Sequence, residues 1–471
     1  MNINLKKIDI NNIGFFRFKE LNGEYLLTNE LGDFIFLNKE KFKRFIEGKL
    51  DKNSSIYKEL SKKNFINTSL DRKEVIKRYR YRYGFLWQGS SLHIVVVTLR
   101  CNQRCIYCQS SSVSPSAKGY DMSITVAKKV VDRIFTSPSP AITIEFQGGE
   151  PLINWKTTKY IISYALKKNK KYNKDLRISL VSNFNFLDED KLDFLINNRV
   201  SLCTSLDGPE KIHNKNRPEM ILGKNSYRNT INWIKKIKRR YKDNITLNAL
   251  VTISKYSLRY PEAIIDEYIK WGFWEIHLRP LSYLGISKIN RKKIGYKSEE
   301  FINFYKKALD YLIHLNLKGK TNMSERTARV FLTKILTDKD PGYLDIRSPC
   351  GAGIGQVTYN YDGKIFCCDE ARMIGEDIFC IGDIRRNWEE GLHYKVLGAV
   401  IQASTLEGLY CDYCVYKPYC GVCPVCNYAF SGSIFSQVYN DRCKINKSIL
   451  DYLFLRLKDK RIKSIFNNWI K

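Results

Sequence analysis

Between residues 90 and 280, short apolar runs alternate with longer segments in which apolar residues recur at every third or fourth position. The short runs are typical of buried strands, and the longer spacing is typical of amphipathic helices. We expect strands at 93–99, 142–146, 178–181, 200–206, 247–252 and 275–278, and helices near 123–136, 156–169, 188–197, 226–239 and 260–271. Strands that alternate with helices form a parallel sheet through right-handed crossovers. The pattern therefore predicts an α/β core whose sites lie at the carboxyl ends of its strands.

The pattern differs on both sides of this core. Residues 1–88 read as a small α+β domain, because Asn22-Gly23 can join two short strands and Asn38 can cap a helix. The expected elements are strands at 13–21, 24–28 and 33–37 and helices from 39 and at 54–63. Residues 89–320 form the core, which a helix near 298–316 closes, and residues 321–471 are irregular until a helix at 444–457. A domain with so little periodic structure needs additional stabilisation, such as disulfides or bound metals.

Cysteines are the residues that could provide this stabilisation. Of fourteen, three lie at 101–108, four at 350–380 and six at 411–443, and Cys203 stands alone. No apolar run is long enough to span a membrane, and MNINLKKIDINN lacks the apolar segment of a signal peptide. We therefore expect a cytoplasmic protein with no membrane contact, in which thiols stay reduced and clustered cysteines bind metal. Five histidines, none inside a cysteine cluster, argue against mixed Cys/His zinc sites.

The first cysteine cluster follows the first core strand directly. Cys101, Cys105 and Cys108 have the spacing CxxxCxxC, with Tyr107 before the last cysteine. Three thiolates on one loop can bind three irons of a cubane and leave the fourth iron open to a chelating small molecule. A zinc ion would need a fourth nearby ligand, and none follows.

This loop resembles the signature of the radical S-adenosylmethionine (SAM) enzymes. That resemblance implies a partial (β/α)6 barrel, a SAM-binding [4Fe–4S] cluster on the three cysteines, and no further catalytic residue that we can name. Gln147–Pro151 is similar to the family's GGEP motif, Ser182-Asn183 to its Thr-Asn pair, and Thr204–Pro209 with His213 and Arg217 to the SxDGP…H…R segment of peptide-modifying members. Asp207 in that segment could equally start a turn. The cofactor-binding residues implied are Tyr107, Gly148, Gly149, Glu150, Pro151, Ser182, Asn183, Ser205 and Arg217.

The C-terminal cysteines are similar to the SPASM domain, which holds two auxiliary [4Fe–4S] clusters. The resemblance implies an outer cluster on Cys411, Cys414, Cys420 and Cys443 and an inner one on Cys350, Cys368 and Cys423. Two residues separate Cys420 from Cys423 where the family usually has three, and no cysteine lies in 351–357. The inner cluster then has an open iron or takes Cys367, Cys380 or Cys426 as its fourth ligand. A zinc ribbon is the alternative, because CxxC pairs suit zinc.

A SPASM region on a radical SAM core implies a peptide substrate, and the whole chain most resembles the maturase of the His-Xaa-Ser peptide system. The implied reaction is SAM cleavage to a 5′-deoxyadenosyl radical, hydrogen abstraction and oxidative cross-linking of a precursor peptide. The implied partners are that peptide, an electron donor such as flavodoxin or ferredoxin, and a second radical SAM maturase. Residues 1–88 loosely resemble a leader-recognition element. The alternatives are formylglycine formation as in sulfatase maturases and, in another class, a non-enzymatic Fe–S or zinc scaffold that binds peptide or nucleic acid.

Charge changes this picture little. The formal net charge is +31, from 79 Lys and Arg against 48 Asp and Glu. The basic runs 168–171 and 235–240 lie on the polar sides of expected helices without interleaved aromatic residues. A nucleic-acid partner is therefore not expected, and an acidic peptide makes better use of the charge.

Overall fold

The structure, a computed structural model, describes residues 8–9, 11–220, 224–241, 245–386, 394–407, 409–435 and 441–471. Its N-terminal part is an antiparallel sheet of β1 (Arg17–Leu21), β2 (Glu24–Thr28) and β3 (Phe34–Leu37), in that order, beside α1 (Lys39–Ile46) and α2 (Ser55–Lys62). Asn22 and Gly23 have φ angles of 53° and 80°, which confirms the predicted hairpin turn. The Asn38 side chain accepts the Lys41 N–H at 2.8 Å, which confirms the helix cap.

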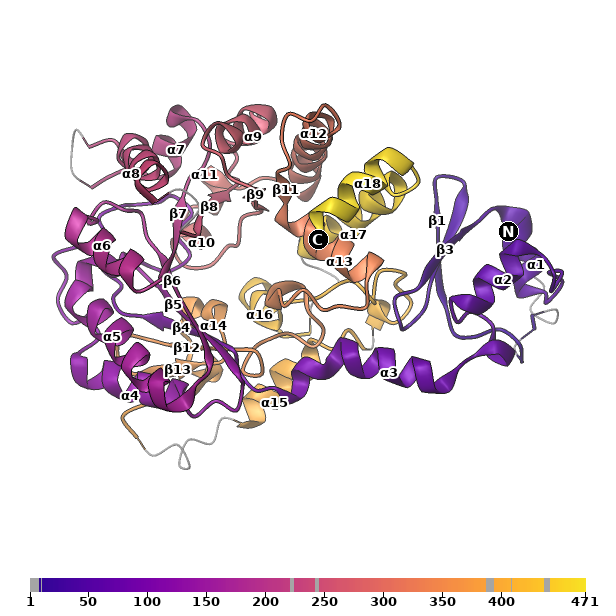
Figure 1. Cartoon of the computed structure of the whole chain (residues 1–471), viewed down its shortest axis with the longest axis horizontal. Helices are drawn as coiled ribbons and strands as arrows, with labels where there is room; N and C mark the ends of the chain where they lie inside the picture. The colour runs from indigo at the N-terminus through magenta and orange to yellow at the C-terminus, as the bar shows by residue number, and fades with distance from the viewer. Residues whose placement is uncertain are drawn as a thin grey trace.

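The core is one open sheet in the strand order β10-β8-β7-β6-β5-β4-β12-β13-β14 among the described residues (Figure 1). The strands from β4 to β10 pair in parallel, as predicted for a partial barrel. No pairing closes the sheet within those ranges. The bounds are β4 Leu92–Val96, β5 Ala141–Gln147, β6 Asp175–Val181, β7 Ser201–Ser205, β8 Leu247–Thr252 and β10 Leu278–Arg279.

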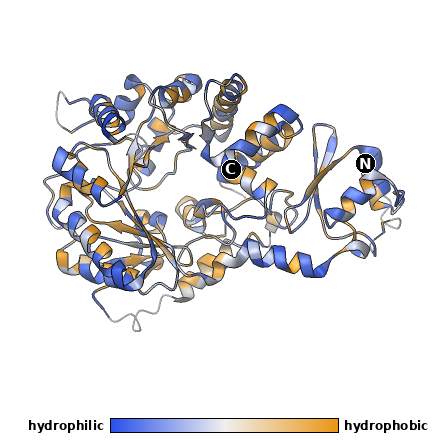
Figure 2. Ribbon diagram, viewed as in Figure 1, coloured by the Kyte–Doolittle hydropathy of each residue, from blue (hydrophilic) through white to orange (hydrophobic). Residues whose placement is uncertain are grey.

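Helices cover this sheet because each has one apolar face. In α4 the buried residues are Ala127, Val130, Val131 and Ile134, which recur at helical spacing. Figure 2 shows the same division, with hydrophobic strands inside and hydrophilic outer faces on the helices. The helices of this region are α4 Ile124–Ile134, α5 Trp155–Tyr172, α6 Glu189–Asn197, α7 Glu210–Asn216, α8 Ser226–Tyr241, α9 Pro261–Lys270, α10 Ile286–Ile289, α11 Arg291–Ile294 and α12 Ser298–Leu317.

The sixth predicted strand differs from expectation. The run 275–278 splits at His277, so that β9 (Glu275–Ile276) pairs with β11 (Ser324–Glu325), whereas β10 pairs with β8. The Glu325 carboxylate accepts the Leu278 N–H at 3.1 Å and so ties the two pairs together. A short apolar run gives no information on its pairing partner, which explains the error.

The C-terminal region is less irregular than predicted. Strand β12 (Gln356–Tyr359) pairs in parallel with β4 and in antiparallel with β13 (Lys364–Phe366), which pairs with β14 (Cys380–Asp383). This part of the chain therefore extends the core sheet. Its helices are α13 Arg326–Leu336, α14 Asp369–Ile374, α15 Tyr394–Ala403, α16 Pro424–Ser431, α17 Asp441–Arg456 and α18 Lys460–Trp469. Across the described residues, no helix has the length and apolar character needed to cross a membrane.

A helix that the pattern did not predict, α3 (Arg72–Tyr83), connects the N-terminal sheet to the core along the lower edge in Figure 1. Its buried Arg82 donates to the carbonyl of Pro418 at 2.9 Å. The N-terminal sheet lies against the C-terminal region, since the Phe34 and Phe454 rings pack edge to face at 5.1 Å and Thr28 donates to the carbonyl of Val415 at 2.7 Å. Six of the twelve residues of α3 are basic. They hide the helical spacing of its apolar residues, which explains why the hydrophobic pattern did not predict this helix.

Candidate active site

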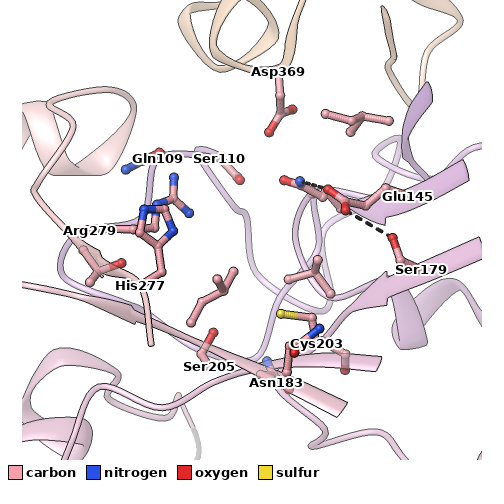
Figure 3. Close-up of a pocket in the computed structure, with 18 of the residues that line it drawn as sticks. Gln109, Ser110, Glu145, Ser179, Asn183, Cys203, Ser205, His277, Arg279 and Asp369 are labelled. Atoms are coloured by element: carbon pink, nitrogen blue, oxygen red, sulfur yellow. Dashed lines mark hydrogen bonds between the residues drawn. The ribbon is translucent and has the colours of Figure 1, made fainter. Parts of the chain in front are cut away.

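A cavity of about 520 Å³ extends along one face of the parallel sheet, from Leu92 and Ser201 at the starts of β4 and β7 to the carboxyl ends of the strands. It brings together nearly all the residues predicted for the cluster and cofactor. Those that line it are Cys101, Cys105, Tyr107, Cys108, Gly148, Gly149, Glu150, Ser182, Asn183, Ser205 and Arg217. Pro151 does not line it and instead begins the short helical turn η4 (Pro151–Asn154), where it is buried. Figure 3 shows how Asn183 and Ser205 approach the cavity from neighbouring strands.

The cysteine loop offers three thiols to this cavity. The Cys101 sulfur accepts the Gln103 N–H at 3.5 Å and the Asn183 amide at 3.8 Å, and the Cys108 sulfur contacts the Ser112 hydroxyl at 3.4 Å. Burial raises the pKa of the Cys105 thiol to about 12, and a bound metal ion favours the thiolate against this effect.

These sulfurs fit a cubane. No three His, Cys, Asp or Glu side chains in the described part of the chain converge enough to hold a single metal ion, but a cubane binds each thiolate at a different iron. Soft thiolate donors are the ligands that Fe–S clusters take. The donor set therefore fits the cluster that the sequence predicted.

The two glycines of the GGEP-like segment are required by close backbone approach. A Cβ on Gly149 would stand 2.3 Å from the carbonyl oxygen of Arg100, and Gly148 has a φ of +121°. The Gly149 N–H donates to the carbonyl of Thr98 at 2.9 Å. The glycines therefore let the end of β5 lie directly on the chain that enters the cysteine loop.

The Glu150 carboxylate accepts hydrogen bonds from three groups of the protein itself. It accepts the Leu152 N–H at 3.0 Å, the Ser182 hydroxyl at 2.8 Å and the Asn183 N–H at 2.8 Å. Burial raises the pKa of Glu150, while these three donors act in the opposite direction. Its observed role is to join the ends of β5 and β6, beside the place where a cofactor would bind.

A buried chain of polar groups positions Arg217. Its guanidinium donates to the Tyr107 hydroxyl at 2.8 Å and to Gln103 Oε1 at 3.0 Å, and the Tyr107 hydroxyl donates to Asp207 at 2.5 Å. The other Asp207 oxygen accepts the Thr252 N–H at 3.2 Å. Asp207 therefore does more than start a turn: it fixes Tyr107, which with Gln103 fixes Arg217.

Several cavity residues were not predicted. Glu145 on β5 accepts from Gln147 at 2.5 Å and from Ser179 at 3.1 Å, and burial raises its pKa. Figure 3 shows His277 and Arg279 on the opposite side from Glu145, with Asp369 above them. Cys203, the lone cysteine, also lines the cavity. The available signal was polar residues at alternate positions in otherwise apolar strands, as in AITIEFQ, which indicates a polar interior.

The four cysteines predicted for the outer cluster are brought together. Cys411, Cys414, Cys420 and Cys443 line one small cavity of about 40 Å³, next to Cys423. Lys447 also lines it, and its ammonium lowers the pKa of Cys443 against the larger, raising effect of burial. A cation beside four thiols favours their ionised form.

The inner cysteines form a second group near α14 and α16. Cys368 and Cys423 are the N-cap residues of these two helices. Cys350 is buried, and burial raises the pKa of its thiol to about 12, with the nearby Cys367 and Glu370 adding to the effect. Of the three candidate fourth ligands, Cys426 donates its backbone N–H to the Cys423 sulfur at 3.4 Å, Cys367 directly precedes Cys368, and the Cys380 thiol donates to the carbonyl of Gly382 at 3.3 Å.

Comparison with known proteins identifies the core. Residues 95–268 match the model of the Radical SAM superfamily. The chain is 25% identical over 337 residues to the "Cysteine-type anaerobic sulfatase-maturating enzyme" of Clostridium novyi, which covers 70% of this chain and 86% of that protein. It is 24% identical over 360 residues to the "Radical SAM cyclopropyl synthase TigE" of Paramaledivibacter caminithermalis, covering 73% of this chain and 69% of that protein.

Solved structures share the fold. Native anSMEcpe with bound AdoMet superposes with a TM-score of 0.67 at 22% identity, over 80% of this chain and 99% of that one. SuiB of Streptococcus suis, bound to S-adenosylmethionine, superposes with a TM-score of 0.54 at 14% identity, over 90% of this chain and 98% of that one. The family uses a [4Fe–4S] cluster and SAM, and the three cysteines of the loop are the residues that could hold such a cluster at this cavity. The chain is a radical SAM enzyme, related to the anaerobic sulfatase maturases and to peptide-modifying enzymes.

Proposed function

We propose that this enzyme modifies a ribosomally made precursor peptide, by oxidative cross-linking of its side chains. The observation that carries the proposal is the cavity of about 520 Å³ that the cysteine loop shares with the sheet and with α14. A concave site with polar groups on opposite sides can admit and orient a peptide segment beside the cofactor. The relatives support a peptide substrate, since SuiB has been solved with its precursor peptide SuiA and anSMEcpe with the Cp18Cys peptide.

In this proposal, Cys101, Cys105 and Cys108 hold the cluster. When bound there, SAM supplies a 5′-deoxyadenosyl radical that removes a hydrogen atom from the substrate. Ser205 and Arg217 orient the SAM carboxylate, for which a guanidinium provides bidentate geometry. The two remaining cysteine groups hold auxiliary clusters on the ligands expected from the sequence: Cys411, Cys414, Cys420 and Cys443 in one, and Cys350, Cys368 and Cys423 in the other. The inner group lies close to the first loop, because Arg372 donates to the carbonyl of Ser110 at 3.5 Å.

Formylglycine formation is the second candidate, and the sulfatase-maturating relatives favour it. It needs a base that takes a proton from the substrate. The cavity offers Glu145, whose pKa is raised by burial, and Asp369, which Arg372 holds at 2.8 Å. Cross-linking and formylglycine formation differ in product mass and in the residue changed, so the product distinguishes them.

Within the peptide class, we propose the small repeat-bearing precursors of His-Xaa-Ser systems, on the likeness of LLTNELGDFIFLN, HIVVVTLRCNQRCIYCQ and YKPYCGVCPV. A flavodoxin or ferredoxin would supply the electron, and a second radical SAM maturase would act on the same precursor. Residues 1–88 would bind the leader. An edge strand of the N-terminal sheet, β1 or β3, can pair with an extended peptide through main-chain hydrogen bonds.

The test is anaerobic reconstitution with iron, sulfide, reductant and SAM, followed by addition of the precursor encoded beside the gene. We expect 5′-deoxyadenosine and a precursor that has lost about two mass units for each cross-link. Cys101→Ala, Cys105→Ala and Cys108→Ala should abolish 5′-deoxyadenosine while the protein stays folded. Absence of 5′-deoxyadenosine from the reconstituted wild type would favour the non-enzymatic scaffold, and an unmodified precursor despite SAM cleavage would exclude this substrate.

A further inference from the structure

We propose that Cys426 is the fourth thiolate ligand of the inner auxiliary cluster, which makes the inner site a four-cysteine site with no open iron. The inference rests on the auxiliary clusters of the proposed function. Three thiols come from Cys350, Cys368 and Cys423, and residues 351–357, where a fourth cysteine would be expected, contain none. The geometry around the three thiols decides which other cysteine completes the set.

Each of the three inner sulfurs accepts a hydrogen bond from a backbone N–H group. The Cys368 sulfur accepts the Ala371 N–H at 3.4 Å at the start of α14, and the Cys423 sulfur accepts the Cys426 N–H at 3.4 Å at the start of α16. The third sulfur, of Cys350, accepts the Ala352 N–H at 3.4 Å. Each sulfur thus accepts a backbone N–H, and that of Cys423 lies at the start of the eight-residue helix α16, where a thiolate is favoured.

The two helices are fixed to each other. Tyr428 of α16 donates to Glu376, just after α14, at 2.6 Å, and its ring packs edge to face on Phe379 at 5.1 Å. This contact between α14 and α16 brings Cys368 and Cys423, the N-cap residues of the two helices, into one region of the C-terminal part.

Cys426 is the cysteine that this arrangement adds. It lies three residues after Cys423 in the first turn of α16, on the same helix face, and its N–H donates to the Cys423 sulfur at 3.4 Å. This is the CxxC spacing of Cys411 and Cys414 in the outer set.

The other two candidates fit less well. Cys380 is engaged on β14, where its thiol donates to the carbonyl of Gly382. Cys367 directly precedes Cys368, whose backbone is extended, and its N–H and carbonyl are bonded to Phe379 and Gly353 at 3.3 and 2.8 Å. Side chains of consecutive residues in extended backbone diverge, which disfavours two adjacent ligands on one cubane.

The test uses the full chain with the first cluster removed by Cys101→Ala, Cys105→Ala and Cys108→Ala together. After anaerobic reconstitution this parent should hold about eight irons, four for each cubane. Adding Cys426→Ala should make the inner cluster lose iron, seen after mild oxidation as the EPR signal of a three-iron cluster, or lose it entirely, to about four irons. The matched variants Cys367→Ala and Cys380→Ala should keep about eight irons and give no such signal.

The outcomes separate this proposal from the one on which it rests. A parent without iron would overturn the auxiliary clusters themselves. A parent that already gives the three-iron signal would show an inner cluster with an open iron, and the signal in Cys367→Ala alone would assign that residue; either result overturns Cys426. In case Cys426→Ala does not fold, Cys426→Ser supplies an oxygen ligand in its place. It should retain about eight irons with a changed EPR spectrum of the reduced state, and an unchanged spectrum would contradict the proposal.

Discussion

The carboxylate of Glu150, at the end of β5, accepts the backbone N–H of Asn183, at the end of β6, at 2.8 Å. Asn183 in turn donates to the Cys101 sulfur at 3.8 Å and to the Asn102 side chain at 3.0 Å. The acid of the GGEP-like segment therefore positions the cysteine loop through the neighbouring strand. Its structural contribution can be measured without the cofactor.

Glu150→Gln should destabilise the protein. In the variant, the amide NH₂ replaces one carboxylate oxygen and cannot accept a hydrogen bond from the groups that now donate to Glu150. A buried donor left without an acceptor costs about 1–3 kcal/mol. We expect that decrease in the free energy of unfolding by urea, together with a lower iron content of the first site. Glu145→Gln is the matched control, because its partners Gln147 and Ser179 are side chains that can rotate to suit the amide. Equal stability of wild type and Glu150→Gln would refute the bridging role.

Tyr107→Phe should weaken SAM binding without removing the first cluster. The hydroxyl connects Arg217 to Asp207, so its loss leaves the guanidinium held by Gln103 alone. One lost hydrogen bond to a charged group corresponds to roughly a tenfold increase in Kd, measurable by equilibrium binding of SAM to the reconstituted enzyme. Lys215→Ala is the control. Lys215 is exposed on α7, the helix that Arg217 caps, and this variant should bind SAM as the wild type does. Unchanged affinity in Tyr107→Phe would show that Arg217 does not orient the cofactor.

The site could be predicted where its residues lie close together in the sequence. Cys101 to Cys108 share one loop. Gly148 and Ser182 directly follow β5 and β6, and Ser205 is the last residue of β7, in a sheet whose parallel order the alternation predicts. The support of Arg217 could not be predicted, because Gln103 reaches it across 114 positions and Tyr107 across 110. The pairing of β12 with β4 was also not predicted, because the sequence of a four-residue strand does not indicate which distant strand it pairs with.

Stability should fall as the pH rises through neutrality because of Glu325. Burial raises the pKa of this carboxyl from 4.5 to about 7. A carboxyl whose pKa is higher in the folded than in the unfolded state stabilises the fold below the unfolded value, and that contribution is lost as pH rises through the folded value. The free energy of unfolding should therefore decrease between about pH 4.5 and 7, by up to about 3 kcal/mol.

Urea unfolding at a series of pH values measures this slope. Glu325→Gln cannot titrate, so its curve should be flatter over the same range, even though its absolute stability is lower because the Leu278 and Ala328 N–H groups lose a carboxylate acceptor. Glu299→Gln, on the exposed side of α12, should keep the wild-type slope. A slope in Glu325→Gln equal to that of the wild type would assign the pH dependence to another group.

Phe454 anchors the N-terminal sheet to the outer cysteines. Its buried ring packs on Phe34 and Phe36 of β3, at 5.1 and 6.4 Å, and on Tyr416 and Tyr419, at 6.0 and 5.5 Å. Both tyrosines lie between Cys414 and Cys420. Phe36 thus contacts α17, whereas Phe16 and Phe18 pack on Phe42 within the N-terminal part.

Phe454→Ala should cost about 3–5 kcal/mol of stability, since it leaves a cavity between two domains. The N-terminal sheet should then separate from the Cys414–Cys420 segment, which limited proteolysis after α3 would detect. Iron at the outer site should fall, while 5′-deoxyadenosine formation, which depends on the first loop, persists. Phe466→Ala is the matched control, because this equally buried ring packs on Trp469 within α18, and its cavity should destabilise the protein without these local effects. If both variants are cleaved after α3 and lose iron to the same degree, the effect is global unfolding and Phe454 is no specific anchor.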